Sequence, residues 1–308
     1  MGLLPCARGC AHATAPGYRL RVAGALDDKG ANYPVQGILL PRSGSATVFP
    51  RALASSTLVV TNDTRCPSMK SSGNPRPGPA RTPRVIAHRG ASAAHPPGNT
   101  IAAFAAAGEL GASWVELDVH ICADGGLVVH HDPVLADGRE IGELLTADVP
   151  PQIPLLEPAL LACGGLGVNV EIKSDGPPEL RDRLIDSVIS LLKRSGDPDR
   201  FLVTSFSMEI IDEVRIRASD IPTGFLAVQF GPEHQDLSRI SSAGHVAINP
   251  WFSGIDAELV EAAHASGMAV NVWTVDDPDE MRSLVELGVD GIITNVPDLC
   301  CAVLSEFG

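Results

Sequence analysis

Residues 267–273 read Gly-Met-Ala-Val-Asn-Val-Trp, and residues 289–294 read Val-Asp-Gly-Ile-Ile-Thr. Both runs are almost continuously apolar, which is typical of strands that are buried on both faces. The stretch at 277–287 between them has the spacing of an amphipathic helix. A buried strand, a helix and a second buried strand predict two parallel strands whose connecting helix covers the sheet.

The same alternation of short apolar runs and amphipathic stretches begins at Arg84 and continues to the C-terminus. The predicted strands are 84–88, 113–119, 127–131, 167–173, 200–205, 223–228, 245–249, 268–273 and 289–294. The predicted helices include 99–111, 178–195, 207–218, 256–266, 277–287 and 297–306. Repeated strand–helix units favour a (β/α)8 TIM barrel. A doubly wound open sheet is the alternative, but it should carry a Gly-rich phosphate loop, and the sequence has neither GxGxxG nor GxxxxGK[ST].

Residues 1–83 differ from this body in character. They lack sustained periodicity, and the stretch at 71–84 is too rich in Pro for a helix or a sheet. We therefore interpret 1–83 as a disordered N-terminal extension with a linker, and 84–308 as the barrel. Two alternatives remain open: translation begins at Met69, or the extension contains a small folded module.

Charge also divides the chain. Residues 1–83 carry ten Lys and Arg against three Asp and Glu, whereas 84–308 carry thirteen against thirty-four. An acidic body argues against binding of nucleic acid, which needs a basic face. It also implies that an anionic substrate would need a local cation.

The composition, 44% hydrophobic and 19% charged, fits a globular protein. No run of ~18 apolar residues predicts a transmembrane helix, and the first residues lack the basic and apolar regions of a secretory signal. We therefore expect a cytoplasmic protein without stable membrane insertion, whose seven cysteines are free thiols. The sequence does not indicate an oligomeric state.

Two carboxylates interrupt the buried run Trp114–Val119. Glu116 and Asp118 are two positions apart, so in a strand their side chains point to the same face. Two anions so close together repel each other unless a cation lies between them, which predicts a bound metal. Glu171 repeats the pattern in a later strand, and three carboxylates without His or Cys favour Mg²⁺ or Ca²⁺. The alternatives are an exposed edge strand for the first two acids and a salt bridge from Glu171 to Lys173.

Histidines stand where a barrel places catalytic groups, at the carboxyl ends of strands. His88 follows the first predicted strand and His131 ends the third, and imidazole serves as acid or base near neutral pH. His130 adjoins His131, so only one of the two points inward, and periodicity does not say which. Arg89 is either a phosphate clamp or a structural partner of the acids, and Trp273 is a candidate surface for a polyol or a head group.

Polar or aromatic residues at or near predicted strand ends are His88, Glu116, Asp118, Glu171, Ser205, Asn249 and Trp273. A metal, a histidine pair and cationic side chains suit phosphoryl chemistry, because the charge on phosphate rises in the transition state.

These residues fall into a series of short motifs. In chain order they are His88-Arg89-Gly90, Asn99-Thr100, Phe104, Glu116-Leu117-Asp118-Val119, Asp124-Gly125, His131-Asp132, Glu171-Ile172-Lys173, Asn271-Val272-Trp273-Thr274-Val275 and Gly288-Val289-Asp290-Gly291-Ile292-Ile293-Thr294-Asn295. Their order and spacing resemble the glycerophosphodiester phosphodiesterase family over roughly 84–305.

The resemblance implies a TIM barrel that hydrolyses glycerophosphodiesters, which are small molecules, to glycerol 3-phosphate and an alcohol. It implies that His88 and His131 act as acid and base, and it favours His131 over His130 as the inward residue. It further implies that a glycerol hydroxyl of the substrate attacks phosphorus first and gives a cyclic phosphate that water then opens.

The resemblance also implies a site for one divalent cation. The ligands that match the family's pattern are Glu116, Asp118 and Glu171, and the matching phosphate contacts are Arg89 and Lys173.

The chain departs from the family's pattern in two motifs, and the family's usual small inserted region after the second strand is short here. The usual Pro-Glu-Asn-Thr is Pro97-Gly98-Asn99-Thr100 here, which removes a carboxylate close to the site. The usual Leu-x-Arg-Thr-Thr-x-Gly after His-Asp is also absent from 134–139, near the substrate entrance. Two other functions therefore stay open: a lysophospholipase D-like phosphodiesterase, which needs an apolar groove at the mouth, and a barrel that binds phosphodiesters without turnover. The retained histidine pair counts against the latter.

Overall fold

The computed structural model describes residues 18–19, 40–41, 82–175, 178–230 and 235–308. Near the N-terminus, β1 (Tyr18–Arg19) pairs antiparallel with β2 (Leu40–Pro41). Almost all of the predicted extension 1–83 lies outside the described residues, so its interpretation stays a prediction. The other elements belong to a separate compact unit, Asn62–Gly308.

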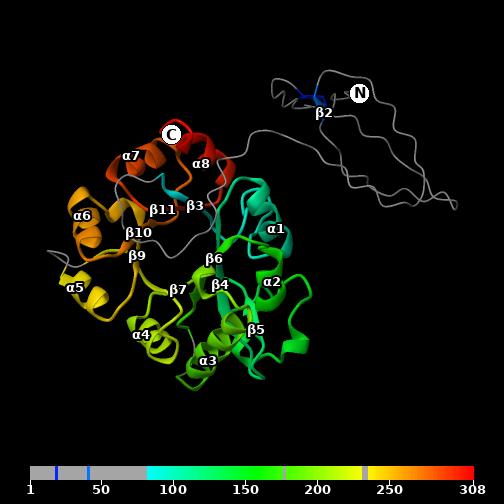
Figure 1. The fold of residues 1–308 in the computed structure, drawn as a ribbon. Helices are drawn as coiled ribbons and strands as arrows, with labels where there is room; N and C mark the ends of the chain where they lie inside the picture. The colour runs from blue at the N-terminus through cyan, green and yellow to red at the C-terminus, as the bar shows by residue number, and fades with distance from the viewer. Residues whose placement is uncertain (1–17, 20–39, 42–81, 176–177, 231–234) are drawn as a thin grey trace, which may run out of the picture. The chain divides into compact units, whose positions relative to one another are not determined.

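Eight parallel strands of this unit form a closed barrel (Figure 1). Their order around the ring is β3-β11-β10-β9-β8-β7-β6-β4, and pairing of Ile86 with Trp114 joins β3 to β4 and closes it. The strands are β3 (Arg84–Ala87), β4 (Trp114–Ile121), β6 (Gly167–Ile172), β7 (Phe201–Ser205), β8 (Thr223–Ala227), β9 (Ala247–Pro250), β10 (Ala269–Val272) and β11 (Gly291–Thr294). The predicted (β/α)8 TIM barrel is confirmed, and the open sheet is excluded because the ring closes.

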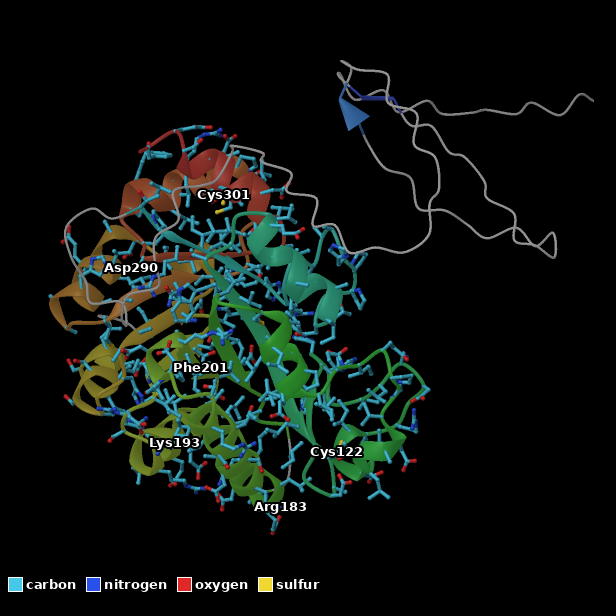
Figure 2. All side chains as sticks on the ribbon, turned by 45° about the vertical axis from the view of Figure 1, so that its right-hand side comes forward. Cys122, Arg183, Lys193, Phe201, Asp290 and Cys301 are labelled. Atoms are coloured by element: carbon cyan, nitrogen blue, oxygen red, sulfur yellow. The ribbon has the colours of Figure 1, made fainter. Side chains whose placement is uncertain are left out.

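The third predicted strand, 127–131, lies outside this ring. β5 (Leu127–Val129) pairs antiparallel with the second half of β4, with Val129 opposite Val119. β4 has eight residues and therefore extends past the barrel rim. Beyond the rim, a small core of Cys122, Val128, Leu135 and Ile141 packs beneath the short 3₁₀ turns η1 (Ile141–Glu143) and η2 (Thr146–Asp148). Figure 2 shows Cys122 in this lobe.

Helices surround the barrel on its outer side (Figure 1). They are α1 (Ile101–Glu109), α2 (Leu156–Ala162), α3 (Pro178–Arg194), α4 (Met208–Arg217), α5 (Gln235–Ser242), α6 (Ala257–Ala265), α7 (Pro278–Leu287) and α8 (Pro297–Leu304). Six of these match predicted helices, whereas α2 and α5 were not predicted. Asp256 and Asp277 cap α6 and α7 by accepting hydrogen bonds from main-chain N–H groups of the first turn.

Two packed layers explain why the strands are apolar on both faces. Val115, Leu117 and Val119 of β4 point outward into the main core that the helices cover. Trp114 points inward and packs with Ile86 and other apolar side chains that fill the lower barrel. The next inward positions of β4 therefore lie above an apolar floor, at the carboxyl end of the barrel.

Among the helices described, none combines the length and the apolar character needed to cross a bilayer. None of the four cysteines in the described part of the chain forms a disulfide. The expected cytoplasmic location stays a prediction.

Candidate active site

A cavity of about 350 Å³ lies at the carboxyl end of the barrel. Its wall contains all eight site residues that the sequence indicated: His88, Arg89, Glu116, Asp118, His131, Glu171, Lys173 and Trp273. These residues lie on or directly after strands β3, β4, β5, β6 and β10, so the closed ring brings together groups far apart in the chain.

Two polar residues at predicted strand ends lie outside this wall. Ser205 donates its hydroxyl proton to the main-chain oxygen of Ile172 at 2.8 Å and is fully buried. Asn249 accepts a hydrogen bond from Asn271 inside the barrel at 3.3 Å. Both side chains serve the packing of the barrel.

Three carboxylates form the centre of the site. Glu116 and Asp118 are only 4% and 1% exposed, and Asp118 pairs in register with Glu171 on β6. One oxygen from each of the three lies within 4.8 Å of the others, and no second group of this kind occurs in the described residues. The edge-strand alternative is thus wrong, because β4 lies inside the barrel wall.

Cations balance part of this negative charge. Lys173 Nζ lies 2.7 Å from Asp118 Oδ1 and 2.6 Å from Glu171 Oε1, so the salt bridge foreseen as an alternative exists within the acidic cluster. Arg89 Nε lies 3.4 Å from Asp118 Oδ2, and Asn99 donates to that same oxygen at 2.7 Å. Burial alone would raise the pKa of Asp118, but Lys173 and then Arg89 hold it below its ordinary value.

The other two carboxylates keep an excess of negative charge. Burial, the neighbouring Asp118 and Glu171 raise the pKa of Glu116 well above its ordinary value. Burial and Asp118 raise the pKa of Glu171 to about 7. Protons or a metal cation must therefore complete the charge balance, and three converging carboxylate oxygens fit Mg²⁺ or Ca²⁺.

His88 is held in one orientation by a chain of hydrogen bonds. Its Nδ1 lies 2.7 Å from Asn295 Oδ1, while the Asn295 amide donates to Asp276 Oδ2 at 2.6 Å. Because the amide nitrogen faces a carboxylate, Oδ1 faces His88 and Nδ1 carries the proton. Burial, assisted by the charge of Arg89, lowers the pKa of His88 to about 4, so its Nε2 is an unprotonated acceptor at neutral pH.

His131 has the opposite environment. Its side chain is 44% exposed, and Nδ1 lies 2.6 Å from Asp132 Oδ1. The neighbouring His130 turns its Nδ1 to the main-chain oxygen of Asp132 at 2.8 Å and is not part of the cavity wall. His131 is thus the inward member of the pair, as the resemblance implied.

The wall across from the charged groups is apolar. It contains Phe206, Leu226, Trp251 and Trp273, and the ring of Trp273 packs edge-on against Trp251 at 5.0 Å and Phe206 at 5.4 Å. The Trp273 indole donates to the main-chain oxygen of Asn249 at 2.7 Å, which fixes the ring. The cavity therefore offers a charged half for a phosphate and an apolar half for carbon-bound hydrogens.

Sequence reasoning missed the groups that orient the catalytic candidates. Asn99 and Asn295 stood in the quoted motifs without a role, and Asp276 was not singled out. The amides hold Asp118 and His88, respectively. A neutral amide has no periodic or charge signal, and only the folded barrel joins His88 to a partner near the C-terminus.

Comparison with known proteins agrees with this geometry. A profile of the glycerophosphoryl diester phosphodiesterase family matches residues 88–299. A glycerophosphodiester phosphodiesterase of Caldanaerobacter subterraneus subsp. tengcongensis is 34% identical over 252 residues, which cover 73% of this chain and 98% of the relative. The chain belongs to this family. It is thus an enzyme, a phosphoric diester hydrolase.

Solved structures of the family have the same fold. A phosphodiesterase of Oleispira antarctica, solved with the product sn-glycerol-3-phosphate, superposes with a TM-score of 0.66 at 26% identity, covering 72% of this chain and 97% of that one. A glycerophosphodiester phosphodiesterase of Parabacteroides distasonis superposes with a TM-score of 0.66 at 26% identity. The match covers 73% of this chain and 98% of that one.

Proposed function

We propose that the protein hydrolyses glycerophosphodiesters to glycerol 3-phosphate and an alcohol, with a divalent cation and the pair His88 and His131. The observation that carries the proposal is that both imidazoles and three converging carboxylates line one cavity. The product complex of the Oleispira phosphodiesterase supports glycerol 3-phosphate as the product.

Glu116, Asp118 and Glu171 would hold the cation. The fit rests on their oxygens, which lie within 4.8 Å of one another, and on the pKa of Glu116, which burial and the neighbouring carboxylates Asp118 and Glu171 raise. When bound, the cation supplies positive charge to a non-bridging phosphate oxygen as the transition state forms.

The histidines divide the proton transfers. His88 Nε2, unprotonated because Asn295 holds the proton on Nδ1, accepts the proton of the attacking hydroxyl of the substrate glycerol. His131, whose Nδ1 lies 2.6 Å from Asp132 Oδ1, is the group that donates a proton to the departing alcohol oxygen as its bond to phosphorus breaks. Water opens the resulting cyclic phosphate in a second step in which the two roles reverse.

Arg89 is the cation best placed to contact phosphate. Its side chain is 27% exposed and touches a single carboxylate, whereas Lys173, only 9% exposed, contacts two. We assign Arg89 the phosphate contact and Lys173 the main task of balancing charge beneath it.

The test measures release of glycerol 3-phosphate from glycerophosphocholine and glycerophosphoethanolamine with Mg²⁺, with Ca²⁺ and with EDTA. Glu116→Gln should abolish metal-dependent release, and Glu209→Gln, which removes a surface carboxylate paired with Arg181, should leave it unchanged. A folded wild-type protein that binds the cation and releases nothing would contradict the proposal and favour a barrel without turnover.

The apolar half of the cavity favours a second candidate, a lysophospholipase D-like activity. Phe206 is 43% exposed at the rim, and Val228, two residues beyond the cavity residue Leu226, is also exposed. An acyl chain on the glycerol could lie along this wall. Phe206→Ala should then lower turnover of lysophosphatidylcholine more than that of glycerophosphocholine, while Phe307→Ala, at equal exposure elsewhere, should change neither.

A further inference from the structure

His120 stands on the strand that carries the two acids. Side chains alternate along β4, so Glu116, Asp118 and His120 share one face. His120 lies where β4 has passed the barrel rim and pairs with β5, opposite Val128. It is only 6% exposed, and no step of the proposed reaction uses it.

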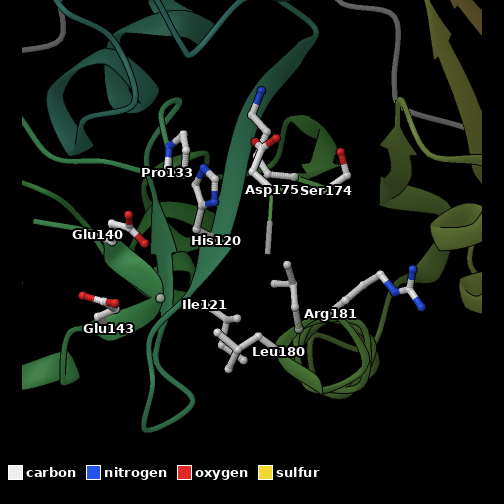
Figure 3. Close-up of a pocket in the computed structure, with 12 residues that line it drawn as sticks. His120, Ile121, Pro133, Glu140, Glu143, Ser174, Asp175, Leu180 and Arg181 are labelled. Atoms are coloured by element: carbon white, nitrogen blue, oxygen red, sulfur yellow. The ribbon is translucent and has the colours of Figure 1, made fainter. Parts of the chain in front are cut away.

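The ring of His120 connects β4 to the loop that carries His131. Its Nε2 lies 3.1 Å from the main-chain oxygen of His131. A carbonyl oxygen only accepts, so Nε2 carries the proton and donates. Figure 3 shows the ring projecting from β4, at the wall of a second cavity of about 210 Å³ beside η1 and α3.

This contact is the buried anchor of His131. Within the described residues, the other hydrogen bond of His131 goes to Asp132, whose side chain is 68% exposed. The main-chain N–H of His130 donates to the main-chain oxygen of Asp118 at 3.1 Å, so pairing with β4 stops one residue before His131. A bond between two exposed side chains fixes a ring weakly, because water competes for both partners.

We propose that His120 is a positioning residue that fixes the main chain of His131, so that its imidazole stays directed at the cavity. The inference rests on the proposed function for the assignment of His131 as a proton donor. β4 then fixes the positions of the carboxylates Glu116 and Asp118 and, through His120, that of His131. A displacement of about 1 Å in such a group costs up to about a hundredfold in rate.

Substitutions separate this role from simple packing. His120→Gln places an amide N–H three bonds from Cβ, as in Nε2 of histidine, and keeps the donor, whereas His120→Leu removes it. We expect kcat for glycerophosphocholine to fall tenfold or more in His120→Leu with KM changed less than about threefold, and to stay within about threefold of wild type in His120→Gln.

A double variant tests whether His120 acts through His131. His120→Leu combined with His131→Ala should be as slow as His131→Ala alone, because an absent imidazole cannot be misplaced. The inference is overturned if kcat of the double variant falls by the product of the two single losses, or if kcat falls equally in His120→Leu and His120→Gln. It is also overturned if His120→Leu no longer binds the cation.

A second readout does not depend on turnover. Imidazole NMR signals of ¹⁵N-histidine-labelled protein, with those of His131 assigned from His131→Ala, should shift or broaden in His120→Leu and stay in place in His120→Gln. Unchanged His131 signals in His120→Leu overturn the inference. Absence of turnover in the wild type overturns the proposed function instead, and the NMR signals still decide whether His120 fixes His131.

Discussion

Lys173 Nζ lies 2.7 Å from Asp118 Oδ1, inside a cluster of three buried carboxylates. The ammonium is also 2.6 Å from Glu171 Oε1 and is therefore the main internal counter-charge of the cluster. Burial alone would lower the pKa of Lys173, but Asp118 and Glu171 raise it above its ordinary value, so the side chain stays charged.

Replacement of Lys173 by Met should make the stability of the barrel depend more strongly on metal than in the wild type. Loss of one partner of a buried ion pair costs about 3–5 kcal/mol, which urea unfolding in EDTA should detect. Mg²⁺ or Ca²⁺ should recover more of the free energy of unfolding in the variant than in the wild type, because the site becomes more anionic.

The matched control is Lys193→Met. Lys193, in the last turn of α3, pairs with Asp220 at 3.4 Å, and its side chain is 43% exposed. An exposed pair contributes about 1 kcal/mol or less, so the control should change little and should not respond to the cation. Equal losses in the two variants would contradict the role given to Lys173.

Divalent cations should also stabilise the wild-type protein. A ligand present at a hundred times its dissociation constant adds about 2.7 kcal/mol to the free energy of unfolding. Thermal melts with Mg²⁺, with Ca²⁺ and with EDTA should show this increase, and the ion with the larger effect at equal concentration is the tighter ligand. Asp118→Asn should lose the response, and Asp137→Asn, an exposed acid paired with Arg139, should keep it.

The strands of the barrel were readable from sequence because each is a short apolar run between helical stretches. The exception is β5, which is a strand but not part of the barrel. Leu127–Val129 has the same apolar character as a barrel strand, and nothing in its residues says that it pairs antiparallel with β4. The direction of β5 follows from its connection to β4, because residues 122–126 are too few for the crossover that a parallel pair needs, and Asp124-Gly125 is a hairpin signal. α2, only seven residues long, carries too little periodicity to be recognised as a helix.

The candidate site could be predicted from the sequence where it consists of charged residues in strands that are otherwise apolar. Glu116 and Asp118 stood out because carboxylates are rare in a buried strand. Asn295 did not, because its contact with His88 joins residues 207 positions apart. His120 resembled any polar strand residue, and its partner is a main-chain oxygen that has no sequence signature.

Gly98 has a steric role that its sequence context did not reveal. Its φ is +83°, and a Cβ built there would lie 2.9 Å from Arg89 Cβ and 2.8 Å from Ser92 Cβ. Gly98→Ala should therefore destabilise the protein by about 1–3 kcal/mol more than Gly267→Ala, whose φ is +77° and whose Cβ would meet open space.

The same crowding bears on the departure from the family's Pro-Glu-Asn-Thr. Gly98→Glu should lower activity, because the new side chain would displace Arg89 from the cavity wall. Urea unfolding and glycerol 3-phosphate release on the three variants check both statements. An active, stable Gly98→Glu would show that the loop adapts and that the close approach is unimportant.

His245 should make stability depend on pH. It is buried between Thr223, 2.7 Å from Nδ1, and Asp212, 3.0 Å from Nε2, with Arg215 and Arg239 also facing it. Burial lowers its pKa more than Asp212 raises it, so the folded protein holds His245 neutral. The unfolded chain takes up a proton below about pH 6.5, and stability is therefore lost as pH falls below that value.

His245→Gln places an amide N–H near the position of Nε2 and removes the titrating group. The free energy of unfolding of the wild type should exceed that of His245→Gln by the largest amount at pH 8. This difference should shrink between pH 6.5 and 5, by about 1.4 kcal/mol for each unit by which folding lowers the pKa of His245. Urea unfolding at pH 8, 7, 6 and 5 measures it, with the exposed His95→Gln as control. A difference that stays constant with pH would show that His245 contributes through packing and hydrogen bonds alone.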